Sequence, residues 1–172
     1  YSFNGKVNSA SVNLGKAELA GENIPCVWKE DKIVNKPATI GGKEYKVTLV
    51  NLGNPHCVVF SEKVDAVDVE TVGPLFENCE YFPERINAEF IRVVNRVTIK
   101  MRVWERGNGE TWSCGTGAAA AVVAAVLNGY CDRDTNITVK LRGGDLVVNY
   151  HSDGEVELMG SVKTVYEGRL EI

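Results

Sequence analysis

The sequence predicts an α+β fold in which an antiparallel β-barrel wraps around one central helix. Two observations lead to this prediction. Short runs that alternate apolar and polar residues recur along the chain, and one helical segment, 116–127, is apolar on every face. Such a helix must be buried all round, and its alanines keep it thin enough for a curved sheet to enclose. We therefore expect one complete domain of this kind, with further strands that belong to a second domain.

The composition limits the classes of protein that this chain can represent. Its 172 residues are 44% hydrophobic and 24% charged, as in a globular domain, which excludes disordered and fibrous proteins. The net charge is -4, and no basic block could follow a phosphate backbone, so we expect no nucleic-acid partner. The longest apolar stretch, 118–127, is too short to span a bilayer, so we expect no membrane partner.

The five cysteines indicate free thiols. Their number is odd, they are widely spaced, and no Cys-x-x-Cys pair occurs, so neither a metal site nor a disulfide framework is predicted. Residues 1–20 contain no apolar leader segment. We therefore expect the reducing cytoplasm as the location of the protein.

Strands are expected wherever the alternation is clear. It is clearest in 96–104, where every second side chain is apolar. The turn-forming sequences 143–145 and 152–154 separate the last three strands, as hairpins require. The expected strands are 6–12, 45–50, 56–60, 89–94, 96–104, 137–141, 146–150 and 155–159.

Two helices are expected between these strands. The first covers about 67–78 and contains Pro74, which predicts a kink or a break. The second is the apolar helix, for which Asn128 and Gly129 supply a C-terminal stop. The turn-rich segment 36–43 is the best candidate for a domain boundary.

The start of the apolar helix is the strongest candidate for a catalytic site. Cys114 lies directly before it, where the helix dipole and the unpaired N–H groups favour a thiolate that could act as nucleophile or base. The N–H groups of Gly115, Thr116 and Gly117 could bind an anion such as a carboxylate. The alternative is a small buried cysteine before a helix that Thr116 caps.

Three other segments carry polar side chains that could serve a site. In 104–111, Glu105 and Arg106 follow a strand end, where they could bind the ammonium and carboxylate of an amino acid or form only an exposed charged turn. The segments 53–56 and 84–87 offer Asn54, His56 and Asn87, and each segment taken alone reads as an ordinary turn.

Taken together, these segments resemble the diaminopimelate epimerase family. The sequence has Gly-Asn-Pro-His-Cys at 53–57, Phe-Pro-Glu-Arg-Ile-Asn at 82–87, Trp-Glu-Arg-Gly-x-Gly-Glu-Thr at 104–111 and Ser-Cys-Gly-Thr-Gly-Ala at 113–118. Their order and spacing match the family, and the resemblance extends to the C-terminus. It implies two pseudosymmetric domains, each a β-barrel around a central helix, with the site in the cleft between them.

The resemblance also implies an activity and a role for each matching residue. The family interconverts LL- and meso-diaminopimelate without pyridoxal phosphate or another cofactor, for lysine and cell-wall precursor synthesis, with one cysteine on each face of the substrate α-carbon. Cys114 resembles one of these cysteines. The other matching positions are Gly115 and Thr116 for the backbone grip on the reacting carboxylate, Asn54, Asn87, Glu105 and Arg106 for substrate binding, His56 and Glu105 for adjusting the cysteine pKa values, and Tyr166 for the contact in a homodimer.

The sequence departs from the family pattern in one large respect. A second Cys-Gly-Asn-type motif is absent, and so is the N-terminal segment with its own asparagine and glutamine ligands. We therefore predict that the chain is the C-terminal part of a longer enzyme and is inactive without the missing N-terminal domain. In this plan 1–42 are a remnant of that domain and a linker, 43–162 form the C-terminal epimerase domain, and 163–172 are a strand that returns to the N-terminal domain.

Two other functions are compatible with parts of the sequence. Proline and hydroxyproline racemases look alike around Cys-Gly-Thr-Gly and also use paired thiols. However, a proline substrate has no distal ammonium and carboxylate, so it leaves Glu105 and Arg106 without a role. The missing second cysteine favours an inactive binding or structural domain.

Overall fold

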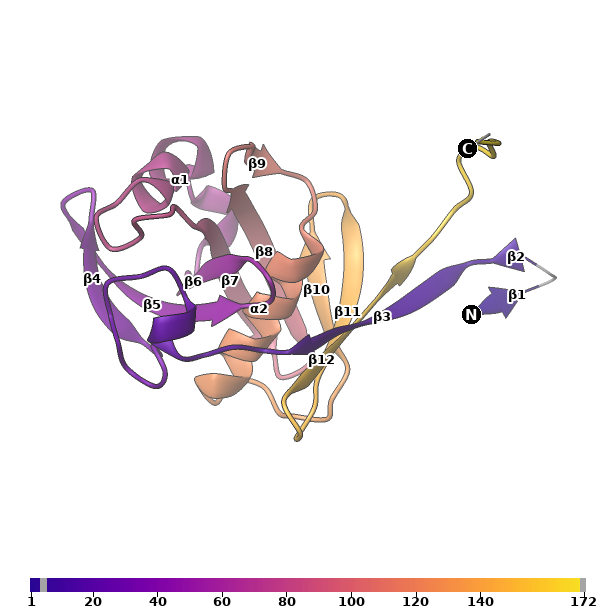
Figure 1. The fold of residues 1–172 in the computed structure, drawn as a ribbon, viewed down its shortest axis with the longest axis horizontal. Helices are drawn as coiled ribbons and strands as arrows, with labels where there is room; N and C mark the ends of the chain where they lie inside the picture. The colour runs from indigo at the N-terminus through magenta and orange to yellow at the C-terminus, as the bar shows by residue number, and fades with distance from the viewer. Residues whose placement is uncertain (4–5, 171–172) are drawn as a thin grey trace.

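One long curved sheet and a single buried helix organise this computed structural model, which describes residues 1–3 and 6–170 (Figure 1). Within those residues the main sheet has ten strands, and β9 lies off its main path, paired with β8. In order across the sheet, the strands are β3 (Ser9–Lys16), β12 (Glu155–Ser161), β11 (Gly144–Tyr150), β10 (Ile137–Leu141), β8 (Thr98–Glu105), β7 (Asn87–Asn95), β6 (Pro55–Phe60), β5 (Lys43–Asn51) and β4 (Lys36–Ile40), with β9 (Gly109–Thr111) beside β8. In the part of the chain that the structure describes, the short strands β1 (Ser2–Phe3) and β2 (Lys6–Val7) form a separate pair. The helical elements are η1 (Gly21–Asn23), η2 (Val64–Ala66), α1 (Val69–Glu77) and α2 (Gly115–Leu127).

The sheet is mixed, so the prediction of a purely antiparallel barrel is wrong. Two neighbouring pairs run parallel: β6 with β7, where His56 lies opposite Asn87, and β8 with β10, where Thr98 lies opposite Thr138. Parallel neighbours need a long crossover connection. The chain supplies these crossovers with its helices, since η2 and α1 connect β6 to β7, and β9 and α2 connect β8 to β10.

The sheet also remains open, which corrects the prediction of a closed barrel. Its two ends, β3 and β4, are not joined in the strand order of the described residues. The nearest approach to closure is an isolated bridge in which Glu18 and Asn51 exchange two backbone hydrogen bonds of 2.9 Å. The curved sheet therefore surrounds α2 without closing, and a single residue pair connects the chain after β3 with the end of β5.

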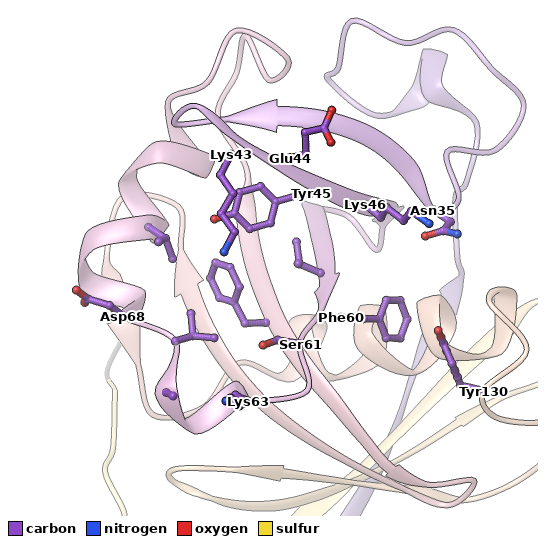
Figure 2. Close-up of a pocket in the computed structure, with 15 residues that line it drawn as sticks. Asn35, Lys43, Glu44, Tyr45, Lys46, Phe60, Ser61, Lys63, Asp68 and Tyr130 are labelled. Atoms are coloured by element: carbon purple, nitrogen blue, oxygen red, sulfur yellow. The ribbon is translucent and has the colours of Figure 1, made fainter.

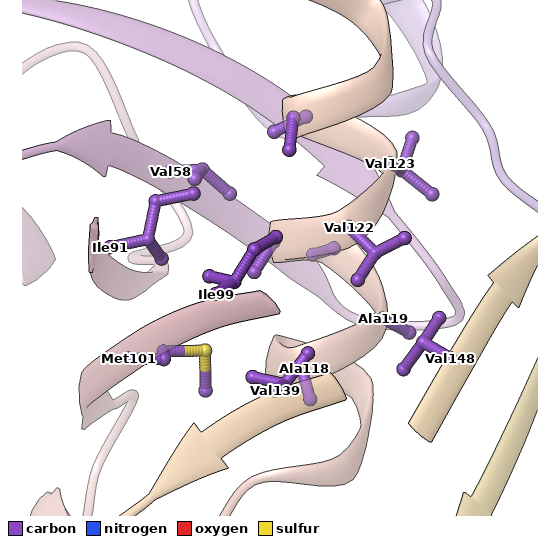
Figure 3. Packing of buried hydrophobic residues seen from close by; sticks show 14 of the residues in the cluster. Val58, Ile91, Ile99, Met101, Ala118, Ala119, Val122, Val123, Val139 and Val148 are labelled. Atoms are coloured by element: carbon purple, nitrogen blue, oxygen red, sulfur yellow. The ribbon is translucent and has the colours of Figure 1, made fainter. Parts of the chain in front are cut away.

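The burial of α2 confirms the prediction made for the apolar helix. Its residues 117–125 are all buried, and it contacts strands from β5 round to β12. Figure 3 shows Ala118, Ala119, Val122 and Val123 of the helix among the apolar side chains of the surrounding strands. The small alanines let these strands approach closely, as the sequence analysis expected.

A second apolar cluster fills the opposite face of β5, β6 and β7. Alternation along β7 divides the two clusters, because Ile91 faces α2 whereas Phe90 packs against Phe76 of α1 with its ring edge-on. Helix α1 starts at Asp68, whose side chain accepts a hydrogen bond from the Thr71 N–H, and it contains Pro74. The prediction of a helix in this region is confirmed.

Several strands extend beyond the expected ranges, and β4 and β9 are among those that were not anticipated. The segment 36–43, which resembles a loop in composition, forms β4 and the turn into β5, with Gly41 and Gly42 at φ of 58° and 77°. The short strand β9 pairs with the end of β8. The strands at 137–141, 146–150 and 155–159 lie within β10, β11 and β12, in the predicted meander.

No helix among residues 1–3 and 6–170 combines the length and the apolar character that crossing a membrane requires. The termini lie on the same side of the body, where β1, β2 and the segment after β12 extend away from the sheet (Figure 1).

Replacement of Gly73 tests the packing of α1 on β8. A methyl group at this position would overlap the ring of Trp104, which cannot move freely because its Nε1–H donates a 2.6 Å hydrogen bond to Glu77. We expect Gly73→Ala to lower the free energy of unfolding by about 1–3 kcal/mol, despite the higher helix propensity of alanine. Urea denaturation should detect this loss. The exposed position Glu70 of the same helix provides the control, Glu70→Ala, for which a change of at most about 0.5 kcal/mol is expected. A Gly73→Ala protein as stable as the unmodified chain would contradict this account of the interface.

Candidate active site

Strand register brings the predicted site residues together at the first turn of α2. The parallel pairing of β6 with β7 sets His56 beside Asn87, and the antiparallel pairing of β7 with β8 sets Ala88 opposite Trp104, so that Glu105 follows at the strand end. Cys114 lies at the start of α2, which the same strands enclose. Segments separated by up to 60 residues in the sequence thus contribute to one region.

The side chain of Asn87 connects three of the four segments that resemble the family. Its Oδ1 accepts a 2.9 Å hydrogen bond from the Arg106 N–H, and its Nδ2 donates a 2.7 Å hydrogen bond to the Pro55 carbonyl. Asn87 is only 5% exposed. The amide group therefore fixes the loop before β6 and the loop after β8 relative to the start of β7.

Cys114 is itself the N-cap of α2, which corrects the alternative in which Thr116 would be the cap. Its backbone is extended, and its Sγ accepts a hydrogen bond of 3.3 Å from the Gly117 N–H. The Thr116 Oγ1 lies 3.7 Å from the same sulfur. The thiol group therefore occupies the position where a serine or aspartate oxygen usually caps a helix.

The environment of Cys114 favours the thiol over the thiolate. Burial, followed by the nearby carboxylate of Glu89, raises the pKa of Cys114 to about 11, although the Gly117 N–H and the Thr116 hydroxyl act in the opposite direction and Glu105 adds a further increase. The expectation of an activated thiolate from helix-start placement is therefore wrong for this chain. At neutral pH the group is an S–H, which can donate a proton.

Beside this cysteine, the predicted residue His56 forms a buried pair with Glu89, which the sequence did not single out. Glu89 of β7 and His56 of β6 are both fully buried, and the Oε1 of Glu89 lies 2.7 Å from the Nδ1 of His56. The Nε2 of His56 lies 3.0 Å from the Oδ1 of Asn54. Burial is the main cause that raises the pKa of Glu89, while His56 lowers it. The signal in the sequence was an acidic residue inside an otherwise apolar strand segment, Ala-Glu-Phe-Ile.

Glycine at 117 makes the close approach of these groups possible. A Cβ at this position would lie 2.9 Å from the Oε1 of Glu89 and 3.1 Å from the Sγ of Cys114, closer than side-chain carbons approach such atoms. Because position 117 carries no side chain, Glu89 and Cys114 can both lie against the first turn of α2.

The loop after β8 carries the predicted charged pair. The carboxylate of Glu105 accepts a hydrogen bond from the Thr111 hydroxyl, and the guanidinium of Arg106 donates a 3.1 Å hydrogen bond to the Glu84 carbonyl. The loop is anchored by the buried carboxylate of Glu77, which accepts hydrogen bonds from the Gly107 N–H and from Trp104. Glu105 and Arg106 are thus held at the edge of the site and are partly exposed.

The structure does not bring every predicted residue to this region. Tyr166 follows β12 in a segment without regular structure, and its side chain is 86% exposed. Its assignment to a dimer contact stays a prediction. In contrast, Gly115 and Thr116 form the first turn of α2 next to Cys114, as expected from the sequence.

A groove on the surface of the described residues lies elsewhere. It has a volume of about 680 Å³ and is bordered by Tyr45, Phe60 and Tyr130 together with several lysines (Figure 2). None of the predicted site residues lines it. Within 1–3 and 6–170, no group of three or more His, Cys, Asp or Glu side chains is arranged to hold a metal ion.

Comparison with known proteins decides the family. The family model described as diaminopimelate epimerase matches residues 48–165. The chain belongs to the diaminopimelate epimerase family. The diaminopimelate epimerase of Bacillus licheniformis is 46% identical over 169 residues, which cover 98% of this chain and 59% of that protein. The diaminopimelate epimerase of Methanococcus maripaludis is 42% identical over 170 residues, again 98% of this chain but 61% of its own length. The chain thus spans about 60% of the curated relatives that it matches.

Solved structures agree with this epimerase and racemase fold. A predicted epimerase from Pseudomonas aeruginosa superposes with a TM-score of 0.57 at 19% identity, covering 94% of this chain and 58% of that one. A probable proline racemase from Agrobacterium radiobacter gives a TM-score of 0.66 at 10% identity, covering 93% of this chain and 52% of its own. At these identities the likeness shows the fold alone.

The pH dependence of Cys114 alkylation tests the protonation state of the thiol. Because the thiolate reacts with iodoacetamide and the thiol does not, we expect the rate at Cys114 to keep rising with pH towards about 11. Peptide mapping by mass spectrometry at a series of pH values measures the rate, and Cys114→Ser identifies the signal. A midpoint at or below about 8.5, the ordinary value for cysteine, would contradict the environment described above.

Proposed function

We propose that this chain forms the C-terminal part of a pyridoxal-independent epimerase that interconverts LL- and meso-diaminopimelate, in the synthesis of lysine and cell-wall precursors. One observation carries the proposal: Cys114, His56 and Asn87, which come from separate segments, lie around the first turn of one buried helix. Family membership supports the choice of substrate, because the curated relatives at 41–46% identity carry the name diaminopimelate epimerase.

In this proposal Cys114 supplies one of two thiols that act on opposite faces of the substrate. An amino-acid α-hydrogen is a very weak acid, so its removal requires a base on one face and stabilisation of the developing charge. Cys114, protonated at neutral pH, suits the opposite step: its S–H bond breaks, a C–H bond forms at the α-carbon, and a thiolate remains. In the reverse direction that thiolate is the base.

The second thiol is assigned to an N-terminal domain. The relatives are long enough to contain such a domain, because this chain covers only about 60% of their length. The other four cysteines are free, and burial raises the pKa of each of them: Cys26, Cys57, Cys79 and Cys131. None of them starts a helix in the described residues. Under the same proposal, 163–172 return to that domain. Of 1–42, which the sequence predicts as its remnant and a linker, β3 and β4 belong to the main sheet described above.

The start of α2 is the proposed grip on the reacting carboxylate. The first N–H groups of a helix have no partner inside the helix, and Gly115 and Thr116 provide two of them beside Cys114. The helix dipole favours negative charge at the same place. These donors are fixed before substrate binds, so they can stabilise charge as it develops on the substrate.

Four side chains are proposed to bind the rest of the substrate: Asn54, Asn87, Glu105 and Arg106. A guanidinium such as that of Arg106 suits a substrate carboxylate, and a carboxylate such as that of Glu105 suits an ammonium group. Asn87 already uses one N–H of its amide for Pro55, and the second N–H is the one proposed for substrate.

His56 and Glu105 are proposed to adjust the pKa values of the two cysteines. We further propose that the protein acts as a homodimer with Tyr166 at the contact, in the cytoplasm. The free cysteines support a reducing location.

A proline or hydroxyproline racemase is the alternative function. The solved structures of a probable proline racemase and a hydroxyproline epimerase share the fold, but at 10% identity they do not indicate the substrate. Protection of Cys114 from alkylation separates the two functions. In the longer protein that contains this chain, we expect LL-diaminopimelate to slow alkylation and proline to have no effect. Protection by proline alone would favour the racemase.

Replacement of Arg106 tests the proposed substrate-binding loop. Loss of one charge-assisted contact costs about 1.5–3 kcal/mol, so Arg106→Ala in the longer protein should weaken diaminopimelate binding by about ten- to a hundredfold. Calorimetry measures the dissociation constant. Thermal denaturation should show little change, because the one hydrogen bond of the guanidinium within the described residues is to the Glu84 carbonyl. The control is Arg92→Ala, an exposed arginine of β7. An unchanged dissociation constant would exclude Arg106 from the site.

The chain of 172 residues alone should not invert the substrate. Inversion needs a proton donor on the face opposite Cys114, and the described residues provide none next to the helix start. We expect LL-diaminopimelate in deuterated water to yield no meso isomer when chiral chromatography resolves the products. Slow α-deuterium exchange with retained configuration is compatible with one thiol. Formation of the meso isomer at an enzymatic rate would contradict the assignment of the second thiol to another domain.

A further inference from the structure

Glu89 is an unusual residue for its position in the sheet. It lies in β7 between the buried apolar residues Ala88 and Phe90, and it is fully buried itself. A carboxyl group in such a place costs free energy unless other groups compensate for its lost hydration, and a well-packed apolar residue would be at least as stabilising. Its presence therefore calls for a role other than packing.

The contacts of His56 define how the pair holds its protons. Both nitrogens of the ring are engaged: Nε2 faces the Asn54 Oδ1 at 3.0 Å, and Nδ1 faces the Glu89 Oε1 at 2.7 Å. When Nε2–H donates to Asn54, one proton remains between Nδ1 and Oε1. It can reside on Nδ1, which gives an ion pair, or on Oε1, which gives a neutral pair. Either way the net charge of the buried pair is zero.

The carboxyl group of Glu89 also faces the thiol of Cys114 across the gap at Gly117. A Cβ on Gly117 would lie 2.9 Å from Oε1 and 3.1 Å from the cysteine sulfur, so the two groups share the space that the missing side chain leaves. The second oxygen of Glu89, Oε2, is buried and has no hydrogen-bond partner in the described part of the chain. The titratable groups on the same face of the sheet as Glu89 are His56 of β6, Glu105 of β8 and Cys114 at the start of α2, whereas Cys57 of β6 points to the opposite face.

We propose that Glu89 is a positioning residue of the proposed epimerase, which orients His56 and keeps Cys114 protonated through the proton that it shares with His56. The proposal rests on the function proposed above. When Cys114 donates its proton to the substrate carbanion, a thiolate forms next to Glu89. Transfer of the shared proton from Nδ1 to Oε1 then neutralises the carboxylate that faces the new thiolate, and it leaves His56 neutral. No proton enters or leaves the pair.

This arrangement explains why a histidine and a glutamate occur together here. A lone carboxylate would oppose formation of the thiolate throughout the reaction, and a lone neutral amide would not hold the thiol protonated before it. The shared proton lets the same pair favour the thiol before proton transfer and tolerate the thiolate after it. Glu89 acts through His56 and Cys114 and does not touch the substrate.

The test is Glu89→Gln in the 172-residue chain, with two measurements that do not depend on turnover. Removing the carboxylate should shift the pH profile of Cys114 alkylation to lower pH by about one unit, which is about a tenfold faster rate at a fixed pH below the midpoint. The ¹⁵N chemical shifts of the His56 ring should change to those of a ring whose Nδ1 no longer shares a proton with a carboxylate. Unchanged alkylation and unchanged ring shifts in a folded variant would overturn the proposal.

Glu77→Gln is the matched control. Glu77 is also a buried glutamate that accepts hydrogen bonds, but its partners are Trp104, Gly107 and Arg85, away from Cys114 on the α1 side of the sheet. We expect its replacement to leave the Cys114 profile unchanged. If Glu77→Gln produced the same shift as Glu89→Gln, the effect would be a general loss of packing, and the proposal would fail.

Two further variants cover the case in which Glu89→Gln does not fold. Gly117→Ala should push the Glu89 carboxyl group away from Cys114 and so shift the alkylation profile in the same direction. Glu89→Asp keeps the carboxylate but has a shorter side chain that reaches His56 less well. Its pH profile of Cys114 alkylation should lie between those of Glu89→Gln and the unmodified chain. A Gly117→Ala profile identical to that of the unmodified chain would count against the proposal.

The longer protein separates this inference from the proposed function. There we expect Glu89→Gln to lower kcat and alter its pH profile with a change in KM of less than about twofold, because Glu89 does not contact substrate. If the longer protein does not turn over diaminopimelate at all, the proposed function fails, and the alkylation and ring-shift results still decide the role of Glu89.

Discussion

The burial of α2 is the constraint on which the rest of the structure depends. A helix with apolar side chains on every face cannot lie on a surface, so the sheet must curve around it. Strands β5 to β8 and β10 to β12 contact the helix, and the curvature brings the ends of β6, β7 and β8 to its first turn. The same feature that forms the core therefore aligns a row of backbone N–H groups with the polar side chains of three separate segments. In this chain, folding and site assembly follow from one packing requirement.

Much of this arrangement could be predicted from the sequence, because alternation records which face of a strand is buried. In β8, Ile99, Met101 and Val103 are buried, as the alternation indicated. Alternation does not indicate which strands pair with each other. For this reason the sequence did not predict the two parallel pairs or the open ends of the sheet. Strand β4 was missed because Pro37 and a pair of glycines resemble a loop, whereas an edge strand tolerates proline.

The chemistry of the site was predicted less completely, since it depends on groups that are distant in the sequence. Placing Cys114 at the start of a helix was correct, and strand pairing brings the other three segments that resemble the family to the same end of α2. Helix-start placement alone suggested a low pKa. The opposite direction results from burial and from Glu89, which lies 25 positions earlier in the sequence and reaches the thiol only through strand pairing. The local sequence indicates the hydrogen-bond donors near the Cys114 sulfur, which lower its pKa. It does not indicate the burial of the thiol or the nearby carboxylate, which the fold adds and which raise the pKa.

The isolated bridge between Glu18 and Asn51 limits where the chain can be truncated without disturbing the site. Asn51 also donates its side-chain N–H to the Asn23 carbonyl and accepts from the Gly53 N–H, so the loop that carries Asn54 is supported by residues that precede it by about 30 positions. Ile24 and Ile33 of the same N-terminal stretch are buried in the cluster beneath β5. Truncation or proteolytic cleavage near residue 42 would therefore expose apolar surface and release this loop, even though no residue of the first 42 is proposed to touch the substrate.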